Sequence, residues 1–78
     1  MPELKLYSSN GCPFCRKVTS FMSANGIKVD IEDPFSSNDA MFAFKGLTGK
    51  TQVPCLIIDG KPMHESDDII QWMKENLA

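Results

Sequence analysis

The segment Asn10–Lys17, NGCPFCRK, places Cys12 and Cys15 three positions apart. Pro13 suits the first turn of a helix, because the backbone N–H that proline lacks would have no helical partner there. Apolar residues then recur at helical spacings up to an NG stop signal, so we predict a helix over residues 13–25. Cys12 would lie just before this helix, where unpaired N–H groups and the helix dipole stabilise a thiolate. Cys15 would lie in the first turn, within reach of a disulfide with Cys12.

Four strands are predicted on either side of this helix. The first two alternate apolar with polar or mixed side chains, which is typical of a strand with one solvent-facing side. The third is rich in β-branched residues and is expected to be buried on both sides. Asp59-Gly60 is a tight-hairpin signal, and Pro62 marks the return strand as an edge. The predicted strands are Leu4–Tyr7, Ile27–Glu32, Val53–Asp59 and Lys61–Glu65.

A second helix is predicted after Pro34. Ser36 or Ser37 would cap its N-terminus, and Gly46 and Gly49 would end it. The side chains expected to face inward are Ala40, Met41, Phe44 and Leu47.

The last helix is predicted to begin with Ser66 as its N-cap. Asp67 and Asp68 follow at the positive end of the helix dipole, which favours acidic side chains. The expected buried stripe is Ile69, Ile70, Met73 and Leu77.

The order of these elements is β-α-β-α-β-β-α. Strands separated by a helix favour a parallel pair, whereas the final hairpin adds an antiparallel pair. We therefore predict an α/β fold with one mixed four-stranded sheet and three helices.

Composition excludes several classes of function. The chain has 78 residues, of which 42% are hydrophobic, and a formal net charge of −2, which suits one small globular domain spanning residues 1–78. Without a basic block, nucleic-acid binding has no electrostatic support. No apolar run approaches the roughly 18 residues of a membrane span, so no membrane association is expected. The opening MPELKLYSSNG does not resemble a secretory signal, and an odd number of cysteines is unusual in secreted scaffolds, so a cytoplasmic location is expected.

The Cys12–Cys15 pair has three possible uses: a redox-active dithiol, a structural bridge or half of a zinc site. A bridge would close too small a loop to constrain the unfolded chain. Cys55 and His64 could complete a Cys3His set, but Cys55 lies in a predicted buried strand and His64 is predicted to be a solvent-facing edge residue. No metal is therefore expected. A C-x-x-C beside a βαβ pattern favours redox chemistry, with Cys55 as a packing residue.

Three separated motifs resemble the glutaredoxin family. They are CPFC at Cys12–Cys15, TQVPCL at Thr51–Leu56 and HESDDI at His64–Ile69, in the family's order and over nearly the whole chain. The resemblance implies a thioredoxin-like fold in which the Val53-Pro54 peptide is cis. It also implies that Cys12 is the catalytic nucleophile and that Cys15 forms the redox-active disulfide with it. Two departures are Ser9, where the family often has lysine, and His64-Glu65, where it has a glycine pair.

The resemblance also implies a glutathione site. Val53 would offer its backbone to the cysteine of glutathione, Lys50 its charge to the glycine carboxylate, and the Ser66–Asp67 helix start its N–H groups and carboxylate to the γ-glutamyl end. The residues implied to bind glutathione are Pro13, Phe14, Lys50, Thr51, Val53, Pro54, Ser66 and Asp67.

The function implied is that of a dithiol glutaredoxin. Such a protein reduces glutathione mixed disulfides and protein disulfides, with glutathione as co-substrate and no permanently bound cofactor. The partners expected are glutathione and glutathionylated or disulfide-containing proteins, and the protein is expected to be a monomer. Three alternatives stay open: a glutathione-ligated iron–sulfur cluster carrier, a thioredoxin reduced by a flavoprotein, and the thioredoxin-like domain of a glutathione transferase, which the Glu65-Ser66 pair resembles.

Overall fold

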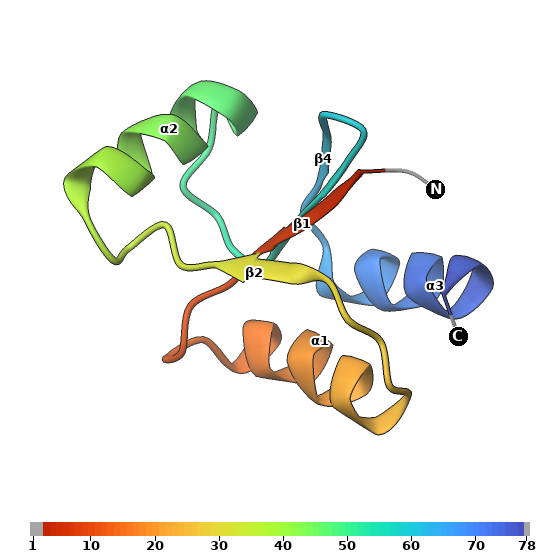
Figure 1. Ribbon diagram of the computed structural model, residues 1–78. Helices are drawn as coiled ribbons and strands as arrows, with labels where there is room; N and C mark the ends of the chain where they lie inside the picture. Colours follow the sequence, from red (N-terminus) through yellow and green to blue (C-terminus); the bar gives the residue numbers. More distant parts are fainter. Residues whose placement is uncertain (1–2, 78) are drawn as a thin grey trace.

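A four-stranded sheet in the order β2-β1-β3-β4 forms the centre of the molecule (Figure 1). The computed structural model describes residues 3–77, so the ends of the predicted domain, residues 1, 2 and 78, lie outside the description. The predicted order and the three helices are confirmed, with bounds β1 Leu4–Tyr7, α1 Pro13–Ala24, β2 Asp30–Glu32, α2 Asn38–Thr48, β3 Cys55–Ile58, β4 Lys61–Met63 and α3 Ser66–Asn76. No helix within residues 3–77 has the length and apolar character needed to cross a membrane.

The sheet is mixed, as predicted. β1 pairs in parallel with β2 and antiparallel with β3, and β3 pairs antiparallel with β4. The turn between β3 and β4 has positive φ at both central residues, 50° at Asp59 and 84° at Gly60, which matches the predicted tight hairpin. Pro62 lies in the edge strand, where its missing N–H costs no ladder hydrogen bond.

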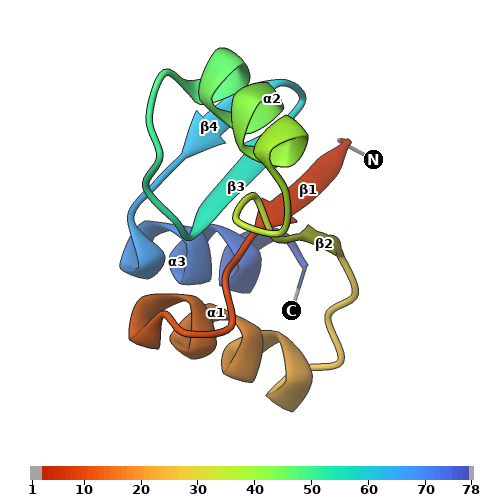
Figure 2. The ribbon, with the colours of Figure 1, turned by 90° about the vertical axis from the view of Figure 1, so that its left-hand side faces the viewer.

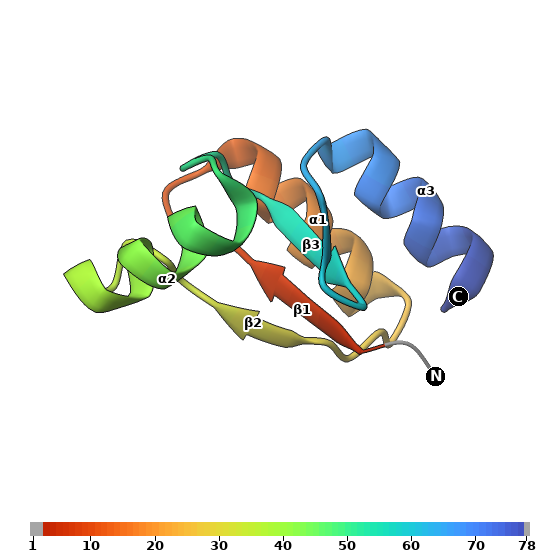
Figure 3. The ribbon, with the colours of Figure 1, turned by 90° about the horizontal axis from the view of Figure 1, so that it is seen from above.

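The helices form two unequal layers around the sheet. Helices α1 and α3 lie side by side on one face, and α2 covers the other (Figure 2). The view from above shows the same arrangement, with the sheet strands passing between these layers (Figure 3). Because successive strand residues point to opposite faces, β1 and β3 supply side chains to both layers.

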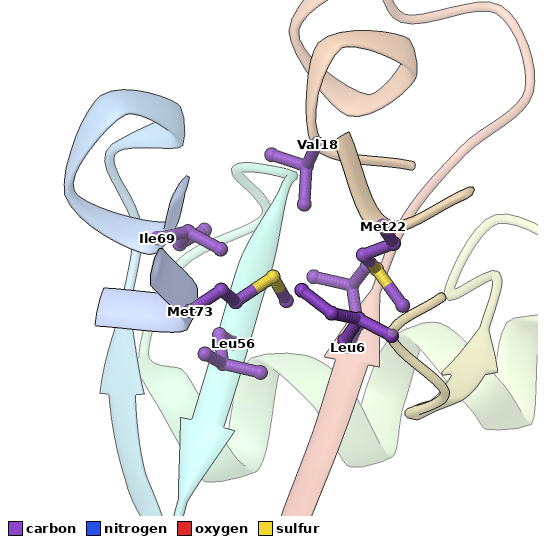
Figure 4. Close-up of a cluster of buried hydrophobic side chains, with 7 residues drawn as sticks. Leu6, Val18, Met22, Leu56, Ile69 and Met73 are labelled. Carbon is purple, nitrogen blue, oxygen red and sulfur yellow. The ribbon is translucent and has the colours of Figure 1, made fainter. Parts of the chain in front are cut away.

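The larger core lies between the sheet and the α1/α3 layer. Its fully buried side chains point toward one another from β1, β3 and both helices (Figure 4). Burial of this apolar surface is the main force that holds α1 against α3. The buried members are Leu6, Val18, Met22, Ile27, Leu56, Ile69 and Met73.

A smaller core lies beneath α2. Phe44, the one fully buried side chain of that helix, packs on the Tyr7 ring with a centroid separation of 4.7 Å. Cys55 and Ile57 of β3 complete the cluster from below. The prediction that Cys55 is a buried packing residue is confirmed.

All strands except β1 are shorter than predicted. Residues 27–29 precede β2 because β1 has only three positions, Lys5 to Tyr7, to pair with it. Ile31 is 53% exposed, so the predicted apolar face of this strand is incomplete. β3 begins at Cys55 and β4 ends at Met63, because the flanking residues have no partner strand.

Both later helices differ from prediction at one end. Ser37 caps α2 by accepting from the Ala40 N–H at 3.0 Å, but Gly46 lies inside the helix, and only Gly49, with φ 74°, ends it. Leu47, predicted to face inward, is 45% exposed, whereas Phe44 is the buried residue of this helix. The predicted Ser66 cap of α3 is also wrong.

The N-cap of α3 is Glu65. Its carbonyl accepts the first helical hydrogen bond, from the Ile69 N–H at 2.9 Å, and Ser66 is the first helical residue. The Glu65 side chain makes no capping hydrogen bond, so the first N–H groups of α3 are not covered by it.

Candidate functional site

Cys12 occupies the N-cap position of α1. Its backbone is extended, with φ −99° and ψ 120°, and its carbonyl accepts from the Arg16 N–H at 3.0 Å. Pro13 is the first helical residue, as predicted. An N-cap usually carries an oxygen that satisfies the first N–H groups of the helix, but here the side chain is a thiol that makes no such hydrogen bond. No capping oxygen satisfies the first N–H groups of α1, and those of Phe14 and Cys15 lie near enough to the Cys12 sulfur to affect its pKa.

This position lowers the pKa of Cys12. The main cause is the backbone N–H of Cys15, with a smaller contribution from that of Phe14, and partial burial opposes the shift. N–H groups at a helix start stabilise the thiolate because they present partial positive charge to it. The fold thus stabilises the thiolate form of Cys12.

Cys15 has the opposite environment. Its side chain is 1% exposed, and burial raises the pKa of its thiol. The Ser9 N–H donates to its sulfur at 3.4 Å. The pair therefore consists of one half-buried thiol with a lowered pKa and one buried thiol with a raised pKa.

The segment before β3 lies against Cys12. The Val53-Pro54 peptide is cis, as expected, and the Cys12 thiol donates to the Val53 carbonyl at 3.9 Å. Val53 and Cys12 are 41 positions apart in the chain. The two residues lie near each other because β1, which precedes Cys12, pairs with β3, which follows Val53.

A groove of about 270 Å³ runs from this contact to the start of α3. It collects five of the residues predicted from sequence to bind glutathione: Phe14, Val53, Pro54, Ser66 and Asp67. It also includes four residues that the sequence analysis did not assign to a site: Lys17, Gln52, His64 and Glu65. The helical spacing of Phe14 and Lys17 was a usable signal for one of them, because residues i and i+3 share a helix face.

Three predicted site residues lie outside this groove. Pro13 is exposed at the start of α1, and Lys50 is exposed in the loop after α2. Thr51 lines a separate, more open hollow of about 600 Å³ at the start of α2. Cys12 does not line either hollow, but its sulfur contacts the carbonyl of Val53, which lines the groove, so the groove is the better candidate for chemistry.

His64 differs from its predicted exposed position. It follows β4, is half-buried, and its Nδ1 atom is buried without a hydrogen-bond partner. His64 lies between β4 and α3 and lines the groove. Within residues 3–77 no three metal-binding side chains converge, so Cys12, Cys15, Cys55 and His64 do not form the Cys3His set considered above.

Charged side chains meet at the α3 end of the groove. The Lys17 ammonium of α1 forms an ion pair with the Asp67 carboxylate of α3. Glu65 lies beside them in the groove wall. This end thus presents one cation, two anions and the unsatisfied N–H groups of a helix start.

The chain was compared with known proteins. Residues 6–78 match the family model described as glutathione S-transferase, N-terminal domain. Among curated proteins, the hybrid peroxiredoxin hyPrx5 of Haemophilus influenzae is 30% identical over 71 residues, which are 90% of this chain and 29% of that protein.

Solved structures show the same architecture. Glutathione S-transferase unclassified 2 from Bombyx mori superposes with a TM-score of 0.80 at 25% identity, covering 95% of this chain and 35% of that one. The holo form of glutaredoxin C1 from Populus tremula × tremuloides superposes with a TM-score of 0.69 at 21% identity, covering 95% of this chain and 76% of that one. The thioredoxin-like fold is therefore confirmed.

This chain spans about a third of the transferase and of the hybrid peroxiredoxin that it matches. The family match covers nearly all of this chain, from β1 to α3. The chain belongs to the glutathione S-transferase N-terminal domain family.

Proposed function

We propose that this protein is a glutathione-dependent thiol–disulfide oxidoreductase of the glutaredoxin type, which works through Cys12 and Cys15. The observation that carries the proposal is the contrast between these two thiols, of which Cys12 contacts the Val53 carbonyl in the groove wall. Cys12 has a lowered pKa and is accessible, whereas Cys15 has a raised pKa and is buried. A transferase domain that only binds glutathione has no need for such a pair.

The first reaction is reduction of a mixed disulfide between glutathione and another thiol. The Cys12 thiolate attacks the glutathione sulfur, the original S–S bond breaks, and the other thiolate leaves and takes a proton from water. A second glutathione thiolate then attacks the Cys12–glutathione disulfide. This step releases oxidised glutathione and restores the Cys12 thiolate. One free glutathione thiol is consumed, because the other half of the oxidised glutathione comes from the mixed disulfide itself.

The second reaction is reduction of a protein disulfide. Cys12 attacks one sulfur and forms a mixed disulfide with the protein. Cys15 then loses its proton, attacks Cys12 and expels the second protein thiolate, leaving a Cys12–Cys15 disulfide that two glutathione molecules reduce. Burial of Cys15 supports this order, because a covered thiol with a raised pKa does not compete for the first attack.

Glutathione is proposed to lie along the groove. Its cysteine would pair with the Val53 backbone beside Cys12, and its γ-glutamyl end would reach the start of α3 at Ser66 and Asp67. The glycine end would extend toward the loop that carries Lys50 and Thr51.

The test is turnover of the mixed disulfide of glutathione and 2-mercaptoethanol, coupled to glutathione reductase. Cys12→Ser should abolish turnover, because serine is not ionised at neutral pH. Cys15→Ser should retain most of it but lose reduction of a protein disulfide. Cys55→Ala is the matched control and should leave both activities unchanged. Equal loss in the Cys12 and Cys15 variants would contradict the assigned roles.

The family match favours one second candidate, the glutathione-binding domain of a longer transferase. In that case the thiolate of glutathione is the nucleophile, and Cys12 only stabilises it. Conjugation of 1-chloro-2,4-dinitrobenzene that persists in Cys12→Ser, together with no disulfide reduction by the wild-type chain, would favour the transferase. We expect disulfide reduction and no conjugation.

A further inference from the structure

We propose that Lys17 is a specificity-determining residue that binds the α-carboxylate of a zwitterionic amino-acid end of the substrate. Asp67 would bind the α-ammonium of the same end. This inference rests on the proposed function for the identity of the substrate class, a γ-glutamyl peptide. It adds a recognition element on α1, which neither the sequence motifs nor the family match assigned.

The ion pair between Lys17 and Asp67 joins two helices at the end of the groove. The residues are 50 positions apart, and their side chains are 53% and 80% exposed. Both line the groove, so a ligand that fills its far end must contact the pair or displace it. Such an exposed pair contributes little to stability, which leaves it free to serve in recognition.

The surrounding groups favour a carboxylate beside Lys17. Ser66, the first residue of α3, is buried, and the Glu65 side chain does not satisfy the first N–H groups of that helix. A carboxylate placed there would accept from these N–H groups and face the Lys17 ammonium.

The same arrangement disfavours a ligand with only one of the two charges. A ligand that carries only an ammonium must compete with Lys17 for Asp67, and binding then leaves the Lys17 ammonium without its partner. A carboxylate without an ammonium gains Lys17 but adds a third negative charge beside Asp67 and Glu65. A zwitterion places each charge next to its opposite, so all four form an alternating set.

The test compares three non-reactive S-methyl peptides that differ only at this end. They are S-methylglutathione, the 4-aminobutanoyl analogue without the α-carboxylate, and the glutaryl analogue without the α-ammonium. Their dissociation constants are measured by NMR titration with wild type, with Lys17→Met and with Lys28→Met. Lys28 is exposed, lies outside the groove and is the matched control.

Lys17→Met should weaken S-methylglutathione binding roughly two- to five-fold, the range for an exposed ion pair. It should not weaken binding of the 4-aminobutanoyl analogue, and Lys28→Met should change neither. Tighter binding of S-methylglutathione by Lys17→Met would overturn the proposal, since Lys17 would then only block Asp67. An equal change for both peptides, or no binding by wild type, would also overturn it.

The two proposals can fail separately. Disulfide turnover without discrimination among the peptides would refute the role of Lys17 alone. Discrimination without turnover would refute the redox function alone. An unchanged rate of Cys12 alkylation in Lys17→Met verifies that α1 is intact in the variant.

Discussion

Replacing Cys55 with alanine should remove a loss of stability that the wild-type chain suffers at alkaline pH. Cys55 is fully buried between Tyr7, Phe44 and Ile57, and this burial raises the pKa of its thiol from 9.0 to about 11. At pH 7 the thiol is almost entirely neutral in both folded and unfolded chains and contributes no pH dependence. Between pH 9 and 11 the unfolded chain loses this proton while the folded chain keeps it, so stability falls as pH rises.

The size of the effect follows from the two pKa values. Each unit of difference corresponds to 1.36 kcal/mol, so the two-unit shift of Cys55 amounts to about 2.7 kcal/mol once both states are ionised. At pH 10 about half of this is lost, or roughly 1.4 kcal/mol. The alanine variant should be less stable than wild type at pH 7, by about 1 kcal/mol for the lost sulfur contacts. The difference should shrink, or reverse, by pH 10.

The assay is urea unfolding of the reduced chain, followed by fluorescence of Trp72, at pH 7, 8, 9 and 10. Subtracting the wild-type curve from that of Cys55→Ala isolates this thiol, because other titrating groups are common to both. Cys12→Ser is the control and should keep the Cys55 contribution. A difference that stays constant from pH 7 to 10 would refute the reasoning, since it would mean that Cys55 ionises as easily in the folded chain as in the unfolded one.

Two further predictions concern the active thiols and the glycines. At pH 7 iodoacetamide should label Cys12 before Cys15 and Cys55. Between pH 8 and pH 6 the alkylation rate of Cys12 should fall less in the folded chain than in the unfolded chain, because folding lowers the Cys12 pKa. An equal fall in both chains would contradict the effect of the helix start. Gly60→Ala should lower the free energy of unfolding by about 1 kcal/mol, because φ at this position is +84°. Gly46→Ala should raise the free energy of unfolding by about 0.5–1 kcal/mol, because Gly46 lies inside α2 with open space around it. Equal shifts of the two variants in urea unfolding would argue against the turn geometry.

Local signals were sufficient wherever the physical cause lies within a few residues. Pro13 placed the start of α1, and Asp59-Gly60 placed the hairpin, since the backbone preference of each residue acts on its own turn. The contrast between Cys12 and Cys15 was also predictable, because it depends on which residue precedes the helix and which lies within it.

Element ends were less predictable, because they depend on partners elsewhere in the chain. Residues 27–29 have the pattern of a strand but find no partner along the short β1. Ser66 has the chemistry of a cap, but the chain enters α3 one residue earlier, at Glu65. The conformational preference of a single residue, about 1 kcal/mol, is too small to fix the end of a helix or strand when tertiary packing favours another position.

The sequence by itself determined the order of the elements, the thiol pair and the helix start that lowers the pKa of Cys12. Only the tertiary structure decided that Val53, Lys17 and Asp67 share one groove, and that His64 lies in its wall rather than in solvent. The reason is that the contacts from α1 to this groove join residues far apart in the chain, 41 positions for Cys12 and Val53 and 50 positions for Lys17 and Asp67. They form because burial of the core beneath α1 and α3 aligns those helices on one face of the sheet, which no local pattern specifies.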